Sequence, residues 1–291
     1  MVDGTYELFR YFFAQPSHVN RDGQEVAATR GVVGSMLSLL AEGATHVGVA
    51  TDHVVESFRN DLWDGYKTGE GIEEELHSQF PLLEDALEAA GFTVWRMVEH
   101  EADDGMATGA AVAAADRRVK QVVICTPDKD LAQCVKGQRV VQFDRRKDFV
   151  YDEKGVVEKF GVSPESIPDY LALVGDAADG FPGLPGWGAK SAATVLSRYP
   201  HLENIPDDPR RWQVKVRGAA KLAATLAEQR ELAELFRRIA TVVEDAPEVG
   251  PVDGWRWSGP TDAFEEICDY LDAPNLPARA KNLASTRKQA Q

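Results

Sequence analysis

Residues 121–131 read QVVICTPDKDL, and this stretch decides the predicted fold. The run 121–126 is short, apolar and rich in β-branched residues, which is typical of a strand buried in a parallel sheet. Two aspartates, Asp128 and Asp130, follow it directly. The stretch therefore predicts a buried strand with acidic side chains just beyond its carboxyl end.

Similar apolar runs lie on both sides of this stretch, at residues 45–51 (THVGVAT), 92–97 (FTVWRM) and 139–143 (RVVQF). Between the runs, apolar residues recur at helical spacing, for example Val32, Met36 and Leu40, and later Phe80, Leu83 and Leu87. Strands that alternate with helices predict an α/β protein with a mostly parallel sheet flanked by helices.

The strand signals fade after about residue 152, and glycine and proline punctuate a helical pattern, notably at residues 180–188 (GFPGLPGWG). We therefore predict an α/β domain over residues 1–152 and a smaller helical domain over 153–291.

Composition sets limits on the class of protein. The 291 residues are 44% hydrophobic, and no apolar run reaches the length of about eighteen residues that a membrane helix needs, so we expect a globular, cytoplasmic protein without a membrane partner. Three scattered cysteines support neither a disulfide framework nor a zinc site. The net charge of −15 argues against a broadly basic nucleic-acid surface, but local patches decide binding, and a carboxylate metal site itself adds acidic residues.

Acidic residues recur where strands are predicted to end, which is where open α/β sheets collect their functional groups. Nearby carboxylates repel one another unless cations compensate them, and carboxylate oxygens are preferred ligands of Mg²⁺. The sequence therefore predicts a metal-binding cluster. Its candidate ligands are Asp3, Asp52, Glu101, Asp103, Asp104, Asp128, Asp130, Asp176 and Asp179.

Each acidic group also has a purely structural interpretation. Asp52, or one of Asp103 and Asp104, could cap the N-terminus of a helix. The segment from Asp128 to Asp130 could be a solvated turn, and Asp176 could close an Asx turn. Only the recurrence of acids at equivalent places favours the metal cluster.

Residues 184–194 (LPGWGAKSAAT) predict a hairpin that opens into a helix. Gly186 and Gly188 permit a tight turn, and exposed amides at a helix N-terminus suit a phosphate group, with Lys190 and Ser191 within reach. Such an element holds DNA backbone without reading sequence. A plain αα-hairpin with glycine in its turn is the alternative.

Together these motifs resemble the 5′-nuclease family, which includes bacteriophage and bacterial 5′ to 3′ exonucleases, the N-terminal nuclease domain of bacterial DNA polymerase I, and flap endonucleases. The resemblance covers nearly the whole chain. It rests on Asp3-Gly4 with Leu8-Phe9-Arg10, on Asp52 with Phe58-Arg59 and Tyr66-Lys67, on Glu101-Ala-Asp-Asp104, on TPDKDL at 126–131, and on GDAADGFPG at 175–183.

The resemblance implies a PIN-like α/β domain with a helical arch near residues 53–80, and a helix-hairpin-helix (helix-three-turn-helix) at 175–199 in the helical domain. It also implies two divalent cations per site, Mg²⁺ or Mn²⁺. By position, Asp3, Asp52, Glu101 and Asp103 would surround one cation, Asp128, Asp130, Asp176 and Asp179 would lie toward the other, and Asp104 would act through water. The sequence leaves open whether K⁺ binds at the hairpin.

The implied activity is that of a metal-dependent 5′ to 3′ exonuclease and flap endonuclease, which hydrolyses DNA at 5′ ends, flaps or nicks by in-line displacement with two metals. We expect a monomer that works without a polymerase in the same chain. Lys67 resembles the family lysine that contacts the scissile phosphate, although an ordinary solvated lysine is the alternative. Arg10 would hold a phosphate or brace an acidic neighbour. Arg59 and Tyr66 would contact DNA with Gly186, Gly188, Lys190 and Ser191, and Tyr66 would stack on a terminal base.

Two positions depart from the family pattern. Glu70 stands where a basic residue is common, which weakens the predicted arch electrostatics, and Gly180 stands where asparagine is frequent. Glu70 and the acidic surface leave open a non-catalytic DNA-junction-binding protein. A PIN-like ribonuclease also remains open, because carboxylate clusters alone do not distinguish RNA from DNA.

Overall fold

The computed structural model describes residues 1–289, so residues 290 and 291 at the end of the predicted helical domain lie outside it. The strands are β1 Val2–Asp3, β2 Gly48–Asp52, β3 Thr93–Met97, β4 Val122–Ile124, β5 Val140–Asp144 and β6 Phe149–Tyr151. The helices are α1 Gly4–Ala14, α2 Ala27–Ala41, α3 Phe58–Leu62, α4 Glu74–His77, α5 Gln79–Ala89, α6 Ala102–Ala115, α7 Glu153–Phe160, α8 Ile167–Val174, α9 Ala189–Leu196, α10 Ala219–Glu228, α11 Arg230–Ala240, α12 Phe264–Tyr270 and α13 Leu276–Gln289.

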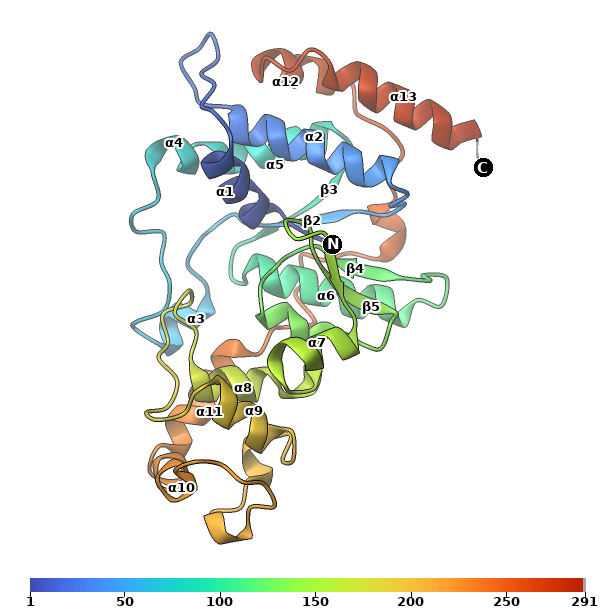
Figure 1. Ribbon diagram of the computed structural model, residues 1–291. Helices are drawn as coiled ribbons and strands as arrows, with labels where there is room; N and C mark the ends of the chain where they lie inside the picture. Colours follow the sequence, from blue (N-terminus) through green and yellow to red (C-terminus); the bar gives the residue numbers. More distant parts are fainter. Residues whose placement is uncertain (290–291) are drawn as a thin grey trace. The chain divides into compact units, whose positions relative to one another are not determined.

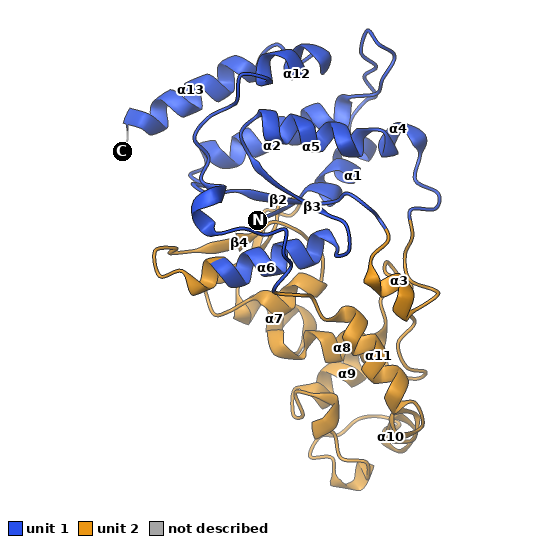
Figure 2. Ribbon diagram, turned by 180° about the vertical axis from the view of Figure 1, so that it is seen from behind, with its two compact units in different colours: residues 1–55, 69–112, 245–291 blue, residues 56–68, 113–244 orange. Residues whose placement is uncertain are grey.

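Two compact units make up the chain (Figure 2). Unit 1 holds residues 1–55, 69–112 and 245–291, and unit 2 holds residues 56–68 and 113–244. These units group the chain differently from the predicted division at residue 152, because β4 to β6 belong to unit 2 and the C-terminal segment belongs to unit 1. The predicted domain boundaries stay a prediction.

Unit 1 is built on a parallel sheet in the order β1-β2-β3 (Figure 1). Val2 pairs with Val49, and Asp52 pairs with Met97. Helices α1, α2 and α5 pack together, and α1 and α5 also contact the sheet. The predicted strands at 45–51 and 92–97 and the helices between them are confirmed, because apolar runs buried on both faces pair in parallel.

Helix α6 lies close to the sheet because two of its residues lack side chains. A Cβ atom at Gly105 would stand 2.9 Å from the sulfur of Met97, and one at Gly109 would stand 2.6 Å from the ring of Trp95. Substitution at either glycine would push α6 away from β3. The two glycines therefore set the position of the first turn of α6, which carries Asp103 and Asp104.

The C-terminal segment completes unit 1 rather than the helical unit. The indole of Trp255 meets that of Trp95 edge to face at 5.1 Å, and Trp257 donates a hydrogen bond to the carbonyl of Ala90 at 2.9 Å. Arg279 on α13 donates to the carbonyl of Gly34 on α2 at 2.9 Å. These aromatic and charge-assisted contacts explain why residues 245–289 associate with the first unit.

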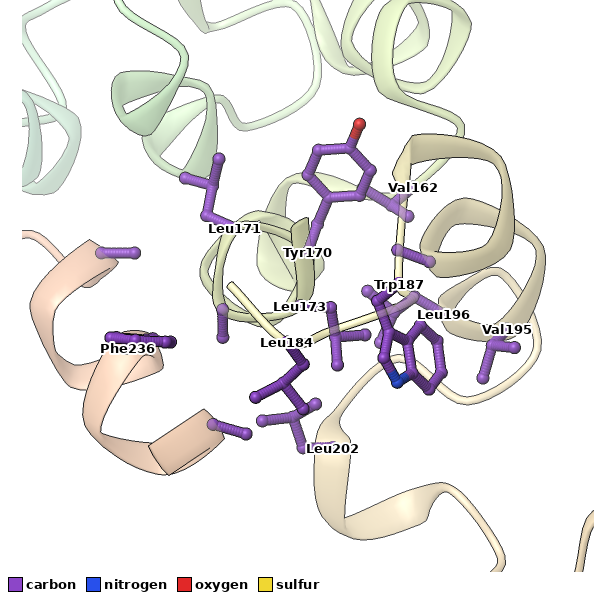
Figure 3. Packing of buried hydrophobic residues seen from close by; sticks show 14 of the residues in the cluster. Val162, Tyr170, Leu171, Leu173, Leu184, Trp187, Val195, Leu196, Leu202 and Phe236 are labelled. Atoms are coloured by element: carbon purple, nitrogen blue, oxygen red, sulfur yellow. The ribbon is translucent and has the colours of Figure 1, made fainter. Parts of the chain in front are cut away.

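Unit 2 combines a small sheet with a helical bundle. Strand β4 pairs with β5 in parallel, and β5 pairs with β6 antiparallel, so the predicted strands at 121–126 and 139–143 are confirmed, while β6 was not predicted. Beyond Tyr151 the described chain forms helices and turns with no further strand, as predicted. Leu173 on α8, Leu184 and Leu202 lie in one buried cluster, and the amide of Leu184 donates to the carbonyl of Leu173 (Figure 3).

The segment predicted as a helical arch, residues 53–80, contains only the short helices α3 and α4 and the start of α5. Residues 63–73 form turns and extended backbone. Lys67 was expected on a helix, and that expectation is wrong because glycines at 65, 69 and 71 interrupt the segment, with φ of +87° at Gly71.

A bilayer crossing needs a long, uniformly apolar helix. Within residues 1–289 no helix has both the length and the apolar character to make one.

Candidate metal centre

The acidic residues of unit 1 lie where its strands end. Asp3 ends β1 and caps α1, because its Oδ1 accepts a hydrogen bond from the amide of Tyr6 at 2.8 Å. Asp52 ends β2, and its Oδ1 accepts from the amide of Ala102 at 2.8 Å. Since β1, β2 and β3 run parallel, their carboxyl ends share one edge of the sheet.

The remaining acids of unit 1 follow β3. Glu101 and Asp104 are buried, and the Oδ2 of Asp104 accepts from the amide of Glu101 at 3.0 Å. Asp103, in the first turn of α6, is half-buried. A capping role is therefore real for Asp104, as one interpretation of the sequence allowed, yet burial of two carboxylates here exceeds what a cap requires.

The acids of unit 2 form the tightest cluster. One carboxylate oxygen from each of Asp130, Asp176 and Asp179 lies within 4.8 Å of the other two, and all three residues are buried. Asp130 opens a 3₁₀ helix after β4, and Asp176 and Asp179 lie in the turn after α8. Two segments far apart in sequence thus bring these three acids together, and Asp128 stands beside them.

The turn that carries Asp176 and Asp179 is closed by local hydrogen bonds. Asp176 exchanges two backbone hydrogen bonds with Phe181, and its Oδ1 accepts from the amide of Ala178 at 3.0 Å. The Asx turn allowed by the sequence therefore exists. It occupies only one oxygen of Asp176, so the turn and a metal site are compatible.

Steric crowding explains why glycine, and not the asparagine frequent in the family pattern, stands at position 180. Its φ is +83°, and a Cβ atom there would stand 2.0 Å from the carbonyl oxygen of Gly65. Any side chain at Gly180 would break this backbone approach. The glycine therefore keeps residue 65 and the acidic turn in contact.

Burial and mutual repulsion perturb the acids of unit 2. Burial raises the pKa of Asp130 well above its ordinary value, and the negative charges of Asp128, Asp179 and Asp176 raise it further. Burial also raises the pKa of Asp128, followed by the charges of Asp179 and Asp176. Such a site favours a bound cation at neutral pH, because a cation removes the repulsion.

Two lysines partly compensate the cluster. The Nζ of Lys67 lies 3.0 Å from Oδ1 of Asp179, and the amide of Lys67 donates to the carbonyl of Asp179 at 3.1 Å. The Nζ of Lys129 lies 2.7 Å from Oδ2 of Asp176. Lys67 is therefore not simply a solvated lysine. Lys129 was not predicted as a site residue, and its position between Asp128 and Asp130 was the available signal.

The chemistry of these donors fits a hard divalent cation. The Oδ1 of Asp130 is buried and has no hydrogen-bond partner within residues 1–289, which is costly unless something else satisfies it. Carboxylate oxygens in a group of three match the preferences of Mg²⁺ and Mn²⁺. The geometry therefore supports one cation position at Asp130, Asp176 and Asp179.

The raised pKa of Asp130 predicts an effect on stability. When the pKa of a carboxyl group is higher in the folded than in the unfolded protein, its protonated form favours folding. That stabilisation is complete at pH values below the unfolded-state pKa and is lost as the pH rises through the folded-state pKa. At pH 7.5 without divalent cations, we therefore expect Asp130→Asn to raise the melting temperature by about 2–4 °C. Mn²⁺ should stabilise the wild type and have little effect on the variant, as calorimetry can measure. The reverse order of the two proteins without metal would contradict this.

The structure contradicts two predicted DNA contacts in unit 2. The side chain of Arg59 is 2% exposed, and its guanidinium donates to the carbonyls of Ile239 at 2.8 Å and Thr241 at 3.1 Å. The ring of Tyr66 is 4% exposed within the core of unit 2. Both side chains stabilise the protein interior, because burial and satisfied hydrogen bonds leave neither surface available to a base or a phosphate.

The predicted hairpin is open where a phosphate would approach. A Cβ atom at Gly188 would meet nothing within 4 Å, and Gly186 has φ of +85°. Lys190 is exposed, with no ion-pair partner in the described chain. Ser191 is used differently from the prediction, because its hydroxyl donates to the carbonyl of Gly188 and accepts from its amide, which caps α9.

Two predicted residues have local roles. The Nη2 of Arg10 lies 2.5 Å from Oε2 of the buried Glu7, so Arg10 braces an acidic neighbour, as one of its two predicted roles allowed. Burial lowers and the Glu7 contact raises the pKa of Arg10, and the net shift is upward. Glu70 is exposed.

A second polar network in unit 1 was missed. The carboxylate of Glu84 is buried, accepts from the hydroxyl of Thr51 at 2.8 Å and contacts Nδ1 of His53 at 2.9 Å. Nε of Arg96 lies 3.4 Å from the same carboxylate. This network fixes the backbone on both sides of Asp52. Its residues lie on separate elements of the chain, so no local sequence motif predicts the network.

Carboxylates at strand ends, together with a glycine-opened hairpin, are the features expected of a metal-dependent nuclease. The sequence matches the family of the 5'-3' exonuclease, N-terminal resolvase-like domain, over residues 1–161, and that of the 5'-3' exonuclease, C-terminal SAM fold, over residues 162–263. The chain belongs to the 5'-3' exonuclease family.

Three similar proteins illustrate this relationship. The 5'-3' exonuclease of Aquifex aeolicus is 34% identical over 70% of this chain and 71% of its own. DNA polymerase I of Pseudomonas aeruginosa is 36% identical over 84% of this chain but only 27% of its own length, so the chain spans about a quarter of that polymerase. The flap endonuclease of bacteriophage T5, solved with DNA and metal ions, has the same fold with a TM-score of 0.62 at 20% identity over 98% of both chains. The predicted family is confirmed.

Proposed function

We propose that this chain is a metal-dependent 5′ to 3′ exonuclease and flap endonuclease that hydrolyses phosphodiester bonds of DNA near 5′ ends. The observation that carries the proposal is the group of Asp130, Asp176 and Asp179, with a buried oxygen of Asp130 left for a ligand, in a member of this family. The name of the Aquifex relative and the DNA and metal ions of the T5 structure support the activity, the substrate and the cation.

The chain would hold Mg²⁺ or Mn²⁺ through carboxylates in both units. In unit 2 the proposed ligands are Asp130, Asp176 and Asp179, with Asp128 beside them. In unit 1 they are Asp3, Asp52, Glu101 and Asp103, with Asp104 acting through water. When bound, such ions lower the pKa of water and stabilise charge on the reacting oxygens of the phosphate, with two per site proposed.

The lysines have separate proposed roles. Lys67 is proposed to contact the scissile phosphate as a point charge, and its contact with Asp179 holds it at the carboxylates before substrate binds. Lys129 is proposed to limit repulsion within the cluster through Asp176. Arg10 is proposed to support catalysis only indirectly, by neutralising the buried Glu7 on α1.

The helix-hairpin-helix is the proposed grip on DNA backbone. Open space at Gly188 and the exposed Lys190 suit a phosphate at the N-terminus of α9, and a K⁺ ion there stays a proposal from the sequence. A cytoplasmic, monomeric enzyme likewise stays a sequence-based prediction.

One assay tests the proposed function. The full chain is incubated with 5′-labelled flap, nicked and gapped DNA duplexes and with matched RNA, in Mg²⁺, in Mn²⁺ and in chelator. We expect cleavage of DNA near its 5′ ends in either metal and none in chelator. A chain that binds the flap and leaves it intact in both metals would be a junction-binding protein, and preferential cleavage of the RNA would make it a ribonuclease.

Replacing Lys190 tests the hairpin grip. Loss of one phosphate contact should weaken duplex binding and reduce the slope of log K against log salt by about 1. The cleavage rate at saturating DNA should change little, because Lys190 is not a metal ligand. Lys120→Ala, which removes an exposed lysine elsewhere in unit 2, is the matched control. An unchanged slope in Lys190→Ala would remove this residue from the interface.

A further inference from the structure

The hairpin between β5 and β6 exposes apolar side chains that the proposed function has not used. Phe149 is 49% exposed and Val150 is 50% exposed on β6, and Val157 on α7 is 43% exposed. These are three of the seven large hydrophobic side chains that the structure, over residues 1–289, leaves most exposed. Such a concentration within nine residues marks a binding surface rather than scattered surface hydrophobics.

Aromatic rings and cations alternate along this surface. The rings of Phe149 and Tyr151 lie 4.7 Å apart, edge to face. The Nζ of Lys159 lies 4.5 Å from the centroid of Tyr151 and 4.7 Å from that of Phe160. We call Phe149, Tyr151, Lys159 and Phe160 the hairpin strip.

Further cations border the hairpin strip. The turn carries Arg145, Arg146 and Lys147, and Arg146 is exposed, with no ion pair in the described part of the chain. Burial lowers the pKa of Lys159, and the positive charge of Lys147 lowers it further.

The acidic residues of the same segment are occupied locally. Asp144 accepts from the amides of Arg146 and Lys147, Asp152 caps α7 through the amide of Gly155 at 2.9 Å, and Glu153 accepts from the amide of Gly137 at 3.0 Å. The carboxylate of Asp144 also lies 3.2 Å from Nζ of Lys147 and pairs with that lysine, whereas Arg146 and Lys159 make no ion pair within residues 1–289.

The hairpin strip continues into the core of unit 2. The rings of Phe160 and Tyr170 lie 6.0 Å apart, and Tyr170 belongs to that buried core. A ring contact therefore joins the hairpin strip to the unit that carries Asp130, Asp176 and Asp179.

We propose that the hairpin strip binds single-stranded nucleic acid, with unpaired bases stacked on its rings and phosphates held by Lys159, Lys147 and Arg146. Alternating aromatic and cationic groups suit a strand whose bases are free to stack, because every base has a stacking face and every linkage a negative charge. The three-residue strand β6 offers little edge for adding a protein strand. The proposal rests on the proposed function and assigns the unpaired arm of its DNA substrate a binding surface on unit 2.

Binding by the full chain in chelator tests the proposal separately from cleavage. The probes are a labelled single-stranded 12-mer and a blunt 12-base-pair duplex. Phe149→Ala should weaken binding of the single strand about tenfold and leave the affinity for the duplex unchanged. Phe149→Trp, which keeps an aromatic ring, should bind the single strand as the wild type does. Lys159→Gln should weaken single-strand binding and flatten its salt dependence. Phe13→Ala removes a 68% exposed ring from unit 1 and is the matched control.

The outcomes separate the two proposals. If Phe149→Ala bound the single strand as tightly as the wild type, or lost affinity equally for single strand and duplex, the proposal that the hairpin strip binds single strands would be overturned. The exposed residues would then be a protein-docking surface, whatever the cleavage result. A chain that cleaves none of the DNA substrates in Mg²⁺ or Mn²⁺, yet loses single-strand affinity on Phe149→Ala, would overturn the nuclease proposal and support the strip.

Discussion

Asp130→Ala is expected to lower the rate of DNA cleavage by about 10³-fold or more. Asp130 contributes a buried oxygen that accepts no hydrogen bond within residues 1–289, so its removal should weaken the cation site at Asp176 and Asp179. A metal ion in such a reaction supplies several kcal/mol of stabilisation, and each 1.4 kcal/mol corresponds to about tenfold in rate. Single-turnover cleavage of a 5′ flap duplex at saturating Mg²⁺ measures the effect.

Binding should move in the opposite direction from cleavage in this variant. Loss of a negative charge eases the approach of phosphates, so affinity for the flap, measured in chelator at fixed salt, should stay the same or increase. Glu42→Ala, which removes an exposed carboxylate from unit 1, controls for net charge and should cleave like the wild type. A cleavage rate within tenfold of wild type for Asp130→Ala would exclude Asp130 as an essential ligand.

Arg59→Ala is expected to destabilise the protein by roughly 3 kcal/mol, because it removes a buried side chain and leaves the carbonyls of the buried Ile239 and of Thr241 without this donor. These carbonyls lie at the C-terminus of α11, where a cation also offsets the helix dipole. Urea unfolding of the metal-free protein should show a lower midpoint with an unchanged slope. Arg59→Lys should recover only part of the loss, since lysine cannot donate in the same forked geometry.

The control for this variant is Arg210→Ala, because the Arg210 side chain is 90% exposed and pairs locally with Asp208. Its effect on the free energy of unfolding should stay within about 0.5 kcal/mol. If Arg59→Ala unfolded like the wild type but bound DNA less tightly, Arg59 would be a DNA contact after all.

The sequence predicted the fold well where burial decides it. Residues 45–51, 92–97 and 121–126 became strands because apolar runs can be buried on both faces of a parallel sheet. Strand β6 escaped prediction because Phe149 and Val150 are exposed at a sheet edge, so no buried pattern marks them. The sequence also did not predict that residues 245–289 belong to unit 1, because this association depends on contacts between residues far apart in sequence, such as Trp255 with Trp95.

The structure agrees with the sequence on where the acidic side chains gather, but not on which basic side chains lie beside them. Carboxylates at strand ends can be located from topology, and the grouping of Asp130 with Asp176 and Asp179 agrees with the order of the motifs. Which basic side chain faces DNA depends on burial, which the motif does not encode. Arg59 and Tyr66 fit a family pattern and proved to be interior, whereas Lys129 matched no pattern and contacts Asp176.

The close approach of Gly180 and Gly65 has a consequence for how this chain can vary. Asp179 and Lys67 each neighbour this contact, and the backbone hydrogen bond between them depends on it. Because a side chain at residue 180 would clash with the backbone of residue 65, these positions constrain each other during sequence divergence. A chain with asparagine at 180 would therefore need a different backbone path near residue 65, which would also move the lysine that the acidic turn holds in place.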